Sequence, residues 1–242
     1  MTILAIVAHP DDADIFCGGT LAKHADRGDE VIVAYMTRGE YGGLEGTETE
    51  VAAIREREAE AAADELGAAD VRFLDHRDSR LEYSLENRRQ VVDLIRETEA
   101  DRLVTHYWED PHPDHRVTGR LVCDAEHVAR LPLAESEHDP YTVENVYCFG
   151  KPSTDFEPDV FVDVSGYMDE KEAAIRAHES QLAFLGEPGG DDEAVENVLD
   201  AIRAEARHAA REAGFQTLSG RGSGTYVEPF VSLDGAAYEY LP

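Results

Sequence analysis

Short apolar segments alternate with longer segments of helical periodicity over the first 130 residues. The apolar segments are 3–8, 31–36, 71–74 and 102–106. A near-continuous apolar run such as 3–8 is typical of a strand buried on both faces, as in parallel sheets. The segments between them predict helices at 20–26, 47–66 and 86–98. Repeated strand–loop–helix units predict an α/β, Rossmann-like fold, with a mostly parallel sheet flanked by helices.

The pattern is less regular after residue 130. It predicts strands at 143–149, 160–164 and 227–231, and helices at 165–184 and 193–213. The sequence contains no internal repeat and no linker long enough to separate two domains. We therefore expect a single domain, 1–242, in which a Rossmann-like core (1–130) carries a less regular C-terminal α+β part (131–242).

Acidic residues far outnumber basic ones. The chain has 52 Asp and Glu against 22 Lys and Arg, which gives a formal net charge of −30. Such a surface repels nucleic acid and anionic membranes, so we expect neither as a partner. Self-repulsion would destabilise the folded state at low salt, and a high-salt cytoplasm would screen it, which favours a halophilic source. A surface built for one cationic partner would concentrate its acidic residues, whereas here they are dispersed.

The cysteines and the start of the chain bear on where the protein works. Cys17, Cys123 and Cys148 are odd in number and show no C-x-x-C spacing, so neither a disulfide framework nor a thiolate zinc site is predicted. The first residues lack the basic region of a signal peptide, and no apolar stretch approaches the roughly 20 residues that span a bilayer. We expect a soluble, cytoplasmic protein.

Two polar clusters follow buried strands. His9-Pro10-Asp11-Asp12 comes directly after the first strand, and His112-Pro113-Asp114-His115 follows the strand at 102–106. The proline of the first cluster cannot donate to a strand ladder, so the strand should end there. The proline of the second suits the first position of a helix, which puts the two residues after it in the first turn. Because open α/β sheets bind ligands at the carboxyl ends of their strands, we expect the two clusters to meet around one metal ion.

His9, Asp12 and His115 are the predicted ligands of that ion. Two imidazole nitrogens and one carboxylate oxygen suit zinc, which takes three protein ligands at catalytic sites and leaves a position for water. The spacing of three between His9 and Asp12 lets both side chains of the turn reach one ion. The same ligands tolerate iron, cobalt or nickel, so the native divalent metal is left open.

The remaining residues of the clusters predict a hydrolase. Zinc lowers the pKa of a bound water from about 16 to about 7 and polarises a carbonyl group. Asp11 would act as the general base that takes the water proton and passes it to the leaving amine. His112 would stabilise the oxyanion of the tetrahedral intermediate, and Asp114 would hold its ring in the correct tautomer.

These motifs resemble the signatures of the LmbE-like/PIG-L family of zinc-dependent de-N-acetylases. The likeness runs from Ala8-His9-Pro10-Asp11-Asp12-Ala13-Asp14 and Cys17-Gly18-Gly19-Thr20, through Thr37-Arg38-Gly39-Glu40, Arg55-x-x-Glu58 and His112-Pro113-Asp114-His115, to Lys171-x-x-Ala174 and His178-x-Ser180-Gln181. It implies a Rossmann-like fold, one zinc ion per chain and hydrolysis of an N-acetyl group on an amino sugar such as N-acetylglucosamine. It also implies a homo-oligomer, either a trimer or a hexamer.

The resemblance carries roles to individual residues. His9, Asp12 and His115 become zinc ligands, Asp11 the general base and His112 the oxyanion stabiliser. Arg55 corresponds to an arginine that contacts substrate, and Asp78 to a sugar-binding aspartate. Asp14 is a departure, because the family often has Glu at this position.

Three other functions remain as alternatives. An amidase for a larger acyl group would be indicated by a wider cavity near the loop 39–46. A metal-dependent phosphoesterase would favour several carboxylates and two metal ions, whereas two histidines and one ligating aspartate favour zinc. A binding module on a nucleotide-binding fold is disfavoured, because no G-x-G-x-x-G follows the first strand and no catalytic group is missing.

Several residues near these motifs have simpler explanations. Arg55 lies on a Glu-rich helix, where an exposed ion pair with Glu58 is the default expectation. His178 and Gln181 lie one turn apart and would either pack or support the site from behind. Six histidines show no partner pattern, and we expect them to be solvated or to cap helices: His24, His76, His106, His127, His138 and His208.

Overall fold

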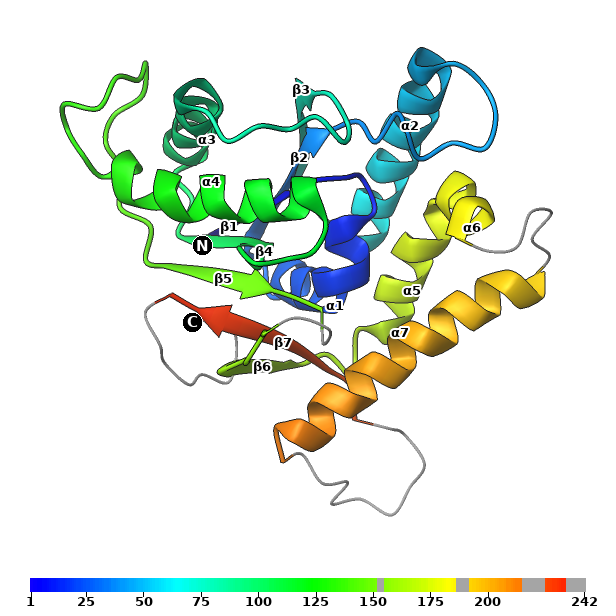
Figure 1. Ribbon diagram of the computed structural model, residues 1–242. Helices are drawn as coiled ribbons and strands as arrows, with labels where there is room; N and C mark the ends of the chain where they lie inside the picture. Colours follow the sequence, from blue (N-terminus) through cyan, green and yellow to red (C-terminus); the bar gives the residue numbers. More distant parts are fainter. Residues whose placement is uncertain (152–154, 186–191, 215–224, 234–242) are drawn as a thin grey trace.

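A computed structural model describes residues 1–151, 155–185, 192–214 and 225–233. The strands are β1 (Thr2–Val7), β2 (Glu30–Thr37), β3 (Asp70–His76), β4 (Arg102–His106), β5 (Asn145–Phe149), β6 (Val160–Asp163) and β7 (Val227–Ser232). The helices are α1 (Asp12–Asp26), α2 (Glu48–Leu66), α3 (Leu85–Thr98), α4 (Pro113–Ala129), α5 (Met168–Ala177), α6 (Glu179–Leu185) and α7 (Asp192–Glu212). Strands and helices alternate as far as α4 and follow a less regular order beyond it (Figure 1).

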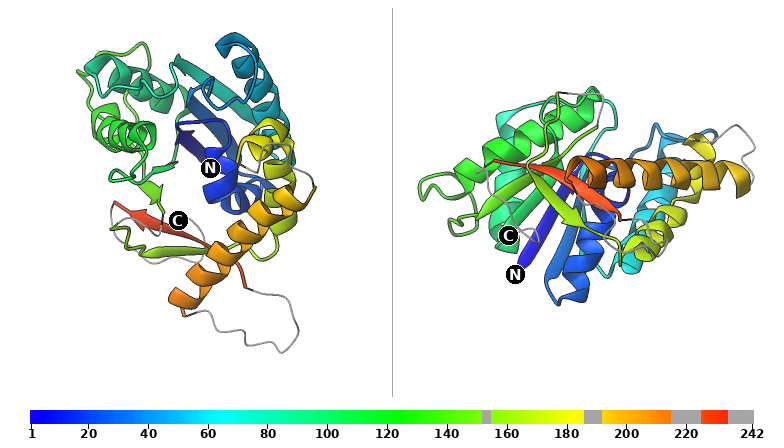
Figure 2. Two further views of the ribbon diagram at one scale, coloured as in Figure 1. Left: turned by 45° about the vertical axis from the view of Figure 1, so that its right-hand side comes forward. Right: turned by 90° about the horizontal axis from the view of Figure 1, so that it is seen from below.

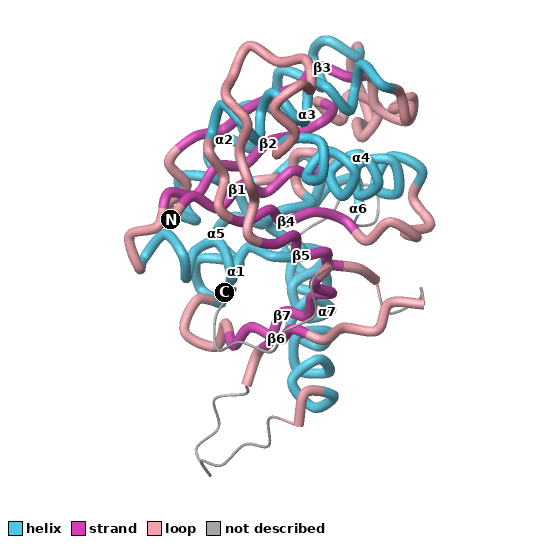
Figure 3. The backbone as a smooth tube through the Cα atoms, turned by 90° about the vertical axis from the view of Figure 1, so that its left-hand side faces the viewer, coloured by secondary structure: helices cyan, strands magenta, loops and turns pink. Residues whose placement is uncertain are grey.

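The described strands form one seven-stranded sheet in the order β3-β2-β1-β4-β5-β7-β6. Figure 3 shows the strands side by side in this order. All neighbouring pairs from β3 to β5 are parallel, whereas β7 is antiparallel to both β5 and β6. The predicted Rossmann-like, mostly parallel sheet with a less regular C-terminal part is therefore confirmed.

Helices cover both faces of the sheet. α3 and α4 pack together over one face, and α1, α2 and α5 pack together over the other (Figure 2). β1 serves both layers because the side chains of a strand point to alternate faces. Ile3, Ala5 and Val7 belong to the core on one face, and Leu4 and Ile6 to the core on the other. All five are fully buried, which explains why the first strand reads as one continuous apolar run.

The first helix begins earlier than expected. α1 starts at Asp12, whereas the sequence pattern predicts a helix only from residue 20. Gly18 and Gly19 lie inside this helix despite their low helix propensity, because a Cβ on Gly19 would lie only 2.7 Å from the Cβ of Val164. Close packing therefore overrides propensity here. As a result, Asp12 and Asp14 occupy the first turn of a helix, where carboxylates are favoured.

Other helix ends follow local rules, with one exception. The predicted capping box is present at the start of α2, where the N–H of Glu50 donates to Thr47 Oγ1 and the N–H of Thr47 donates to the Glu50 carboxylate. The helix predicted at 165–184 is instead two helices, α5 and α6, which are separated at His178. At this turn the buried His178 ring pairs with Asp14 of α1 at 2.8 Å. No helix in the described ranges is both long and apolar enough to cross a bilayer.

A buried ion pair fastens the C-terminal part to the first helix. Lys171 Nζ of α5 lies 2.5 Å from Glu228 Oε1 of β7, and both side chains are almost fully buried. The backbone N–H groups of Gly19 and Thr20 also donate to the Glu228 carboxylate, at 3.0 and 2.7 Å. Three elements far apart in the sequence thus share one satisfied polar cluster.

Replacing one partner of this pair should be costly. In Lys171→Met the Glu228 carboxylate stays buried without its cation, so we expect the free energy of unfolding to fall by about 3–5 kcal/mol. Urea denaturation in high salt measures the change. Lys23→Met is the matched control, because Lys23 Nζ donates to Asp163 O in an exposed position. Equal losses in the two variants would contradict a special role for the buried pair.

Candidate active site

The two polar clusters meet at the carboxyl ends of β1 and β4. His9 Nδ1 lies 3.2 Å from Asp12 Oδ2 and 3.2 Å from His115 Nε2. His115 Nε2 in turn lies 3.2 Å from Asp12 Oδ1. All three side chains are buried. The structure therefore brings the three predicted metal ligands to one point, although more than a hundred residues separate the two clusters along the chain.

The spacing of these donor atoms suits a metal ion. Ligand atoms about 2.0–2.2 Å from a tetrahedral zinc ion lie about 3.3 Å from one another. The charges fit as well. Burial acts to raise the pKa of Asp12, but His115, His106 and His9 hold it well below its usual value. Burial acts to lower the pKa of His115, but Asp12 and Asp110 raise it to about 9. The negative charge of the Asp12 carboxylate is therefore balanced by protons on the neighbouring imidazole rings. A metal ion that binds there displaces these protons and supplies the positive charge instead.

His106 is a buried member of the cluster that sequence reasoning missed. The ring is fully buried, contrary to the expectation that it is solvated. Its Nε2 accepts the backbone N–H of Ala8 at 3.0 Å and lies 3.3 Å from Asp12 Oδ2. Burial and then the neighbouring His115 lower the pKa of His106 to about 4, so the ring is neutral near pH 7. Only its position as the last residue of a buried strand could have indicated this placement.

Asp110 is a second residue that the motifs do not reveal. Its buried carboxylate lies 3.3 Å from His115 Nδ1 and accepts the backbone N–H of His112 at 2.8 Å. A carboxylate on the far nitrogen of a metal-binding imidazole fixes the tautomer and the ring orientation. The sequence does not predict this role, because nothing distinguishes one aspartate before the second motif from the other acidic residues, 52 in all.

Asp114 does not hold the ring of His112 as predicted. Asp114 Oδ2 accepts the N–H of Ser79 at 2.6 Å and lies 3.4 Å from His9 Nε2, while His112 Nδ1 has no hydrogen-bond partner among the described residues. The reason is geometric: residues two apart at a helix start do not face each other. Asp114 instead faces the far nitrogen of His9, as Asp110 faces that of His115.

Arg55 is buried against the predicted general base. Its Nη2 lies 2.6 Å from Asp11 Oδ1, and its Nη1 donates to Gly39 O at 2.9 Å. The expected surface pair with Glu58 is wrong, because Glu58 instead accepts the N–H and hydroxyl of Ser180. A Cβ on Gly39, whose φ is +63°, would lie 2.2 Å from the Arg55 guanidinium. The glycine-rich loop after β2 is therefore shaped around this arginine.

Asp78 forms a wall of the same pocket. Its Oδ2 accepts the N–H of Tyr41 at 3.1 Å, and its Oδ1 lies 3.4 Å from His9 Nε2. Burial acts to raise the pKa of Asp78, but the contact with His9 and the bond from Tyr41 lower it to about 2. The side chain is therefore a carboxylate, an acceptor only, and it faces the pocket that the metal ligands also line.

His178 and Gln181 contact the site from behind. His178 Nε2 pairs with Asp14 Oδ2 at 2.8 Å, and both side chains are almost fully buried. Gln181 Nε2 donates to Gly42 O at 2.7 Å, and Gln181 lines the pocket. Of the two alternatives left open by the sequence, support of the site matches these contacts better than simple packing.

Comparisons with known proteins agree with the site. The family model of GlcNAc-PI de-N-acetylase, PIG-L, matches residues 4–126. Diacetylchitobiose deacetylase of Thermococcus kodakarensis is 34% identical over 190 residues, 74% of this chain and 70% of that protein. The crystal structure of N,N'-diacetylchitobiose deacetylase from Pyrococcus horikoshii is similar with a TM-score of 0.82 and 30% identity, and covers 97% of this chain and 84% of that one.

A relative with another reaction also matches. The 4-oxalmesaconate hydratase of Pseudomonas putida is 29% identical over 189 residues, 74% of this chain and 73% of that protein. Family membership is therefore firm, whereas the reaction has to be argued from the site. The likeness seen in the sequence motifs is confirmed: this chain belongs to the PIG-L, or GlcNAc-PI de-N-acetylase, family.

Proposed function

We propose that this protein is a metal-dependent hydrolase that removes the acetyl group from an N-acetylated amino sugar or glycoconjugate. The observation that carries the proposal is the triangle of His9, Asp12 and His115, with Asp11 and His112 beside it in one pocket. The diacetylchitobiose deacetylases that this chain resembles give the substrate class.

His9, Asp12 and His115 would hold the metal, for which we propose zinc. A divalent ion bound there supplies Lewis-acid polarisation of the amide carbonyl and makes a water molecule more acidic. Asp110 and Asp114, whose carboxylates lie 3.3 and 3.4 Å from the far nitrogens of His115 and His9, would orient the two imidazoles. This revises the role predicted for Asp114, which becomes a positioning residue for His9.

Asp11 would act as the general base. Its carboxylate lies beside the ligands and lines the pocket, and Arg55 binds one of its oxygens and so restrains its orientation. In the reaction Asp11 takes a proton from the attacking water and delivers it to the nitrogen of the leaving amine as the C–N bond breaks. Arg55 would thus act on the reaction through Asp11.

His112 would stabilise the oxyanion. Burial and the neighbouring His115 lower the pKa of His112, which favours the neutral ring with its one N–H to donate. Its backbone is fixed because its N–H donates to Asp110. An N–H aimed at the developing negative charge of the carbonyl oxygen lowers the barrier of acyl transfer. Asp78, which also lines the pocket, would accept hydrogen bonds from sugar hydroxyls.

The relatives favour this reaction over that of the hydratase. The two diacetylchitobiose deacetylases match this chain at 34% and 30% identity, against 29% for the hydratase. Assembly as a trimer or hexamer, a cytoplasmic location and a halophilic source remain predictions.

The proposal is tested by metal analysis together with acetate release from N-acetylated sugars in high salt. We expect about one metal ion per chain, and turnover that falls about 100-fold or more in Asp11→Asn, because the proton acceptor is lost while the ligands remain. Asp64→Asn, an exposed change on α2, is the matched control and should keep full turnover. Full activity of Asp11→Asn, or a chain without metal, would refute the mechanism.

The role of Asp110 is tested on the metal itself. Asp110→Asn removes the acceptor that orients His115, so we expect metal affinity to fall about 10- to 100-fold. Competition between the protein and a chelating dye measures this affinity without a turnover assay. The neighbouring Glu109→Gln is the control, since Glu109 pairs with Arg120 at the surface and should leave affinity unchanged. Equal affinity in both variants would show that Asp110 does not support the metal.

A further inference from the structure

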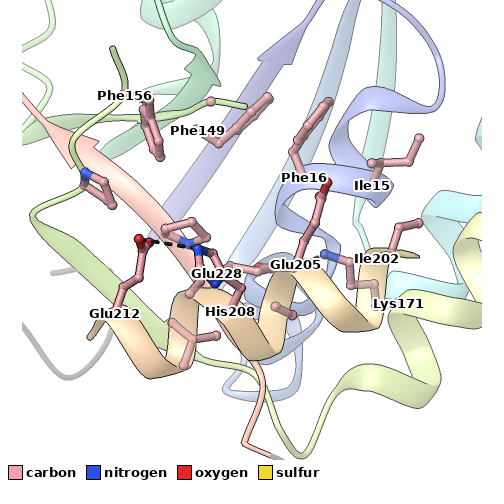
Figure 4. A pocket seen from close by; sticks show the side chains of 16 residues that line it. Ile15, Phe16, Phe149, Phe156, Lys171, Ile202, Glu205, His208, Glu212 and Glu228 are labelled. Carbon is pink, nitrogen blue, oxygen red and sulfur yellow. Dashed lines mark hydrogen bonds and ion pairs between the residues drawn. The ribbon is translucent and has the colours of Figure 1, made fainter. Parts of the chain in front are cut away.

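A second pocket lies on the other side of Phe16. It is bounded by α1, the end of β5, β7 and α7, and its cavity volume is about 200 Å³. Figure 4 shows aromatic side chains along one wall and the side chains of α7 along the other. Its apolar lining includes Phe16, Phe149, Phe156, Ile202 and Ala206. A cavity of this volume is smaller than a site for a whole drug-sized ligand, and its size suits a short acyl chain.

The polar groups of this pocket do not need a ligand. Lys171 and Glu228 lie at its wall, but they pair with each other and with the backbone of α1. Glu205, His208 and Glu212 are exposed, and His208 lies 3.4 Å from Glu212. Apart from the satisfied Lys171–Glu228 pair, the buried side chains that line the pocket are apolar, and two carboxylates lie at its exposed side. This arrangement suits an uncharged hydrocarbon group and disfavours one that carries a carboxylate.

The pocket adjoins the proposed active site. Ile15 and Phe16 line both. The Phe16 ring lies 6.4 Å from the His115 ring, measured between centroids, and stacks on Phe149 at 5.0 Å. One aromatic side chain thus has a metal ligand on one side and the apolar pocket on the other.

The strand order determines which part of a substrate points there. β2 and β3, whose loops supply Tyr41 and Asp78, lie on one side of β1. β5 and β7, which bound the apolar pocket, lie on the other side of β1 and β4. The nitrogen and the acyl carbon attached to an amide carbonyl carbon also diverge from each other, at the trigonal angle. If the amine part, the sugar, lies against Asp78, the acyl group points toward Phe16 and the pocket.

We propose that the pocket receives the acyl side of the substrate, so that the enzyme also hydrolyses amides of unbranched, uncharged acyl groups longer than acetyl. This rests on the proposed function and extends it to a wider substrate class. The reaction is the same: water adds to the carbonyl carbon, the C–N bond breaks, the acyl group leaves as a carboxylate and the amine keeps the proton. From the sequence, a cavity for a larger acyl group is expected near the loop 39–46. That loop is closely packed, because Gly39 and Gly42 lie against Arg55, and the pocket beside Phe16 takes this role instead.

The test compares kcat/KM for N-acetyl, N-butyryl and N-hexanoyl glucosamine. Each buried methylene should raise kcat/KM about fourfold. N-adipoyl glucosamine, which has the same six carbons but ends in a carboxylate, should be hydrolysed at least about tenfold less well than the hexanoyl compound. A profile that falls from acetyl onward would overturn the proposal. So would a gain obtained with an octyl glycoside of N-acetylglucosamine, because the pocket would then receive the aglycone.

Matched variants of α7 locate the effect. Ala206→Leu places a larger side chain in the pocket and should lower kcat/KM for the hexanoyl compound about tenfold, with the acetyl compound unchanged within about twofold. Ala204→Leu changes an exposed alanine of the same helix and should change neither. Ala209→Leu, a second lining position, serves if Ala206→Leu does not fold. Equal profiles in the variant and the control would overturn the assignment.

Binding separates this proposal from the proposed function. If no amide is hydrolysed, the deacetylase function fails, but calorimetry still measures binding of N-hexanoyl and N-acetyl glucosamine. The pocket predicts tighter binding of the hexanoyl compound, and loss of that difference in Ala206→Leu. Equal binding of the two compounds by the unmodified chain would refute the pocket itself.

Discussion

The parallel pairing of β1 with β4 is the constraint on which the site depends. The two strands are in register from Ile3 opposite Arg102 to Ile6 opposite Thr105, so they end at the same edge of the sheet. Where the ladder stops, the ring of His106 accepts the N–H of Ala8 and continues the connection between the strands. His9 and the first turn of α4 are thereby held next to each other. A shift of register by one residue would turn the side chains of β1 to opposite faces and separate the ligands.

Buried charge is the second feature that needs a physical reason. An isolated carboxylate or imidazolium ring costs free energy to bury, so buried charged groups in proteins are usually paired with each other or bound to a metal ion. In this site Asp12 is surrounded by three imidazoles, and two further carboxylates, Asp110 and Asp114, lie against the outer nitrogens of the ligands. A divalent cation at the centre accounts for both sets of residues. It binds deprotonated ligands such as Asp12, and it requires imidazole rings held in a fixed orientation, as Asp110 and Asp114 would hold them.

The sequence predicts the fold and the inner layer of the site well, because both depend on local patterns. The buried strands stand out as apolar runs, and His9, Asp12 and His115 lie in short motifs at strand and helix ends. Asp110 was missed because nothing in the sequence distinguishes it from the other acidic residues, and other supporting residues were missed or misassigned because their partners are remote in sequence. Arg55 reaches Asp11 from α2, and Asp114 turns to His9 instead of its neighbour His112. The early start of α1 depends likewise on a distant contact, the packing of Gly19 on Val164.

The central claim, one metal ion held by His9, Asp12 and His115, is tested most directly by X-ray absorption at the zinc edge of the zinc-loaded protein. The account predicts a first shell of nitrogen and oxygen atoms at about 2.0–2.2 Å, with the outer-shell scattering of two imidazole rings, one of which is lost in His115→Ala. A sulfur ligand at about 2.3 Å, or a shell without imidazole, would contradict it.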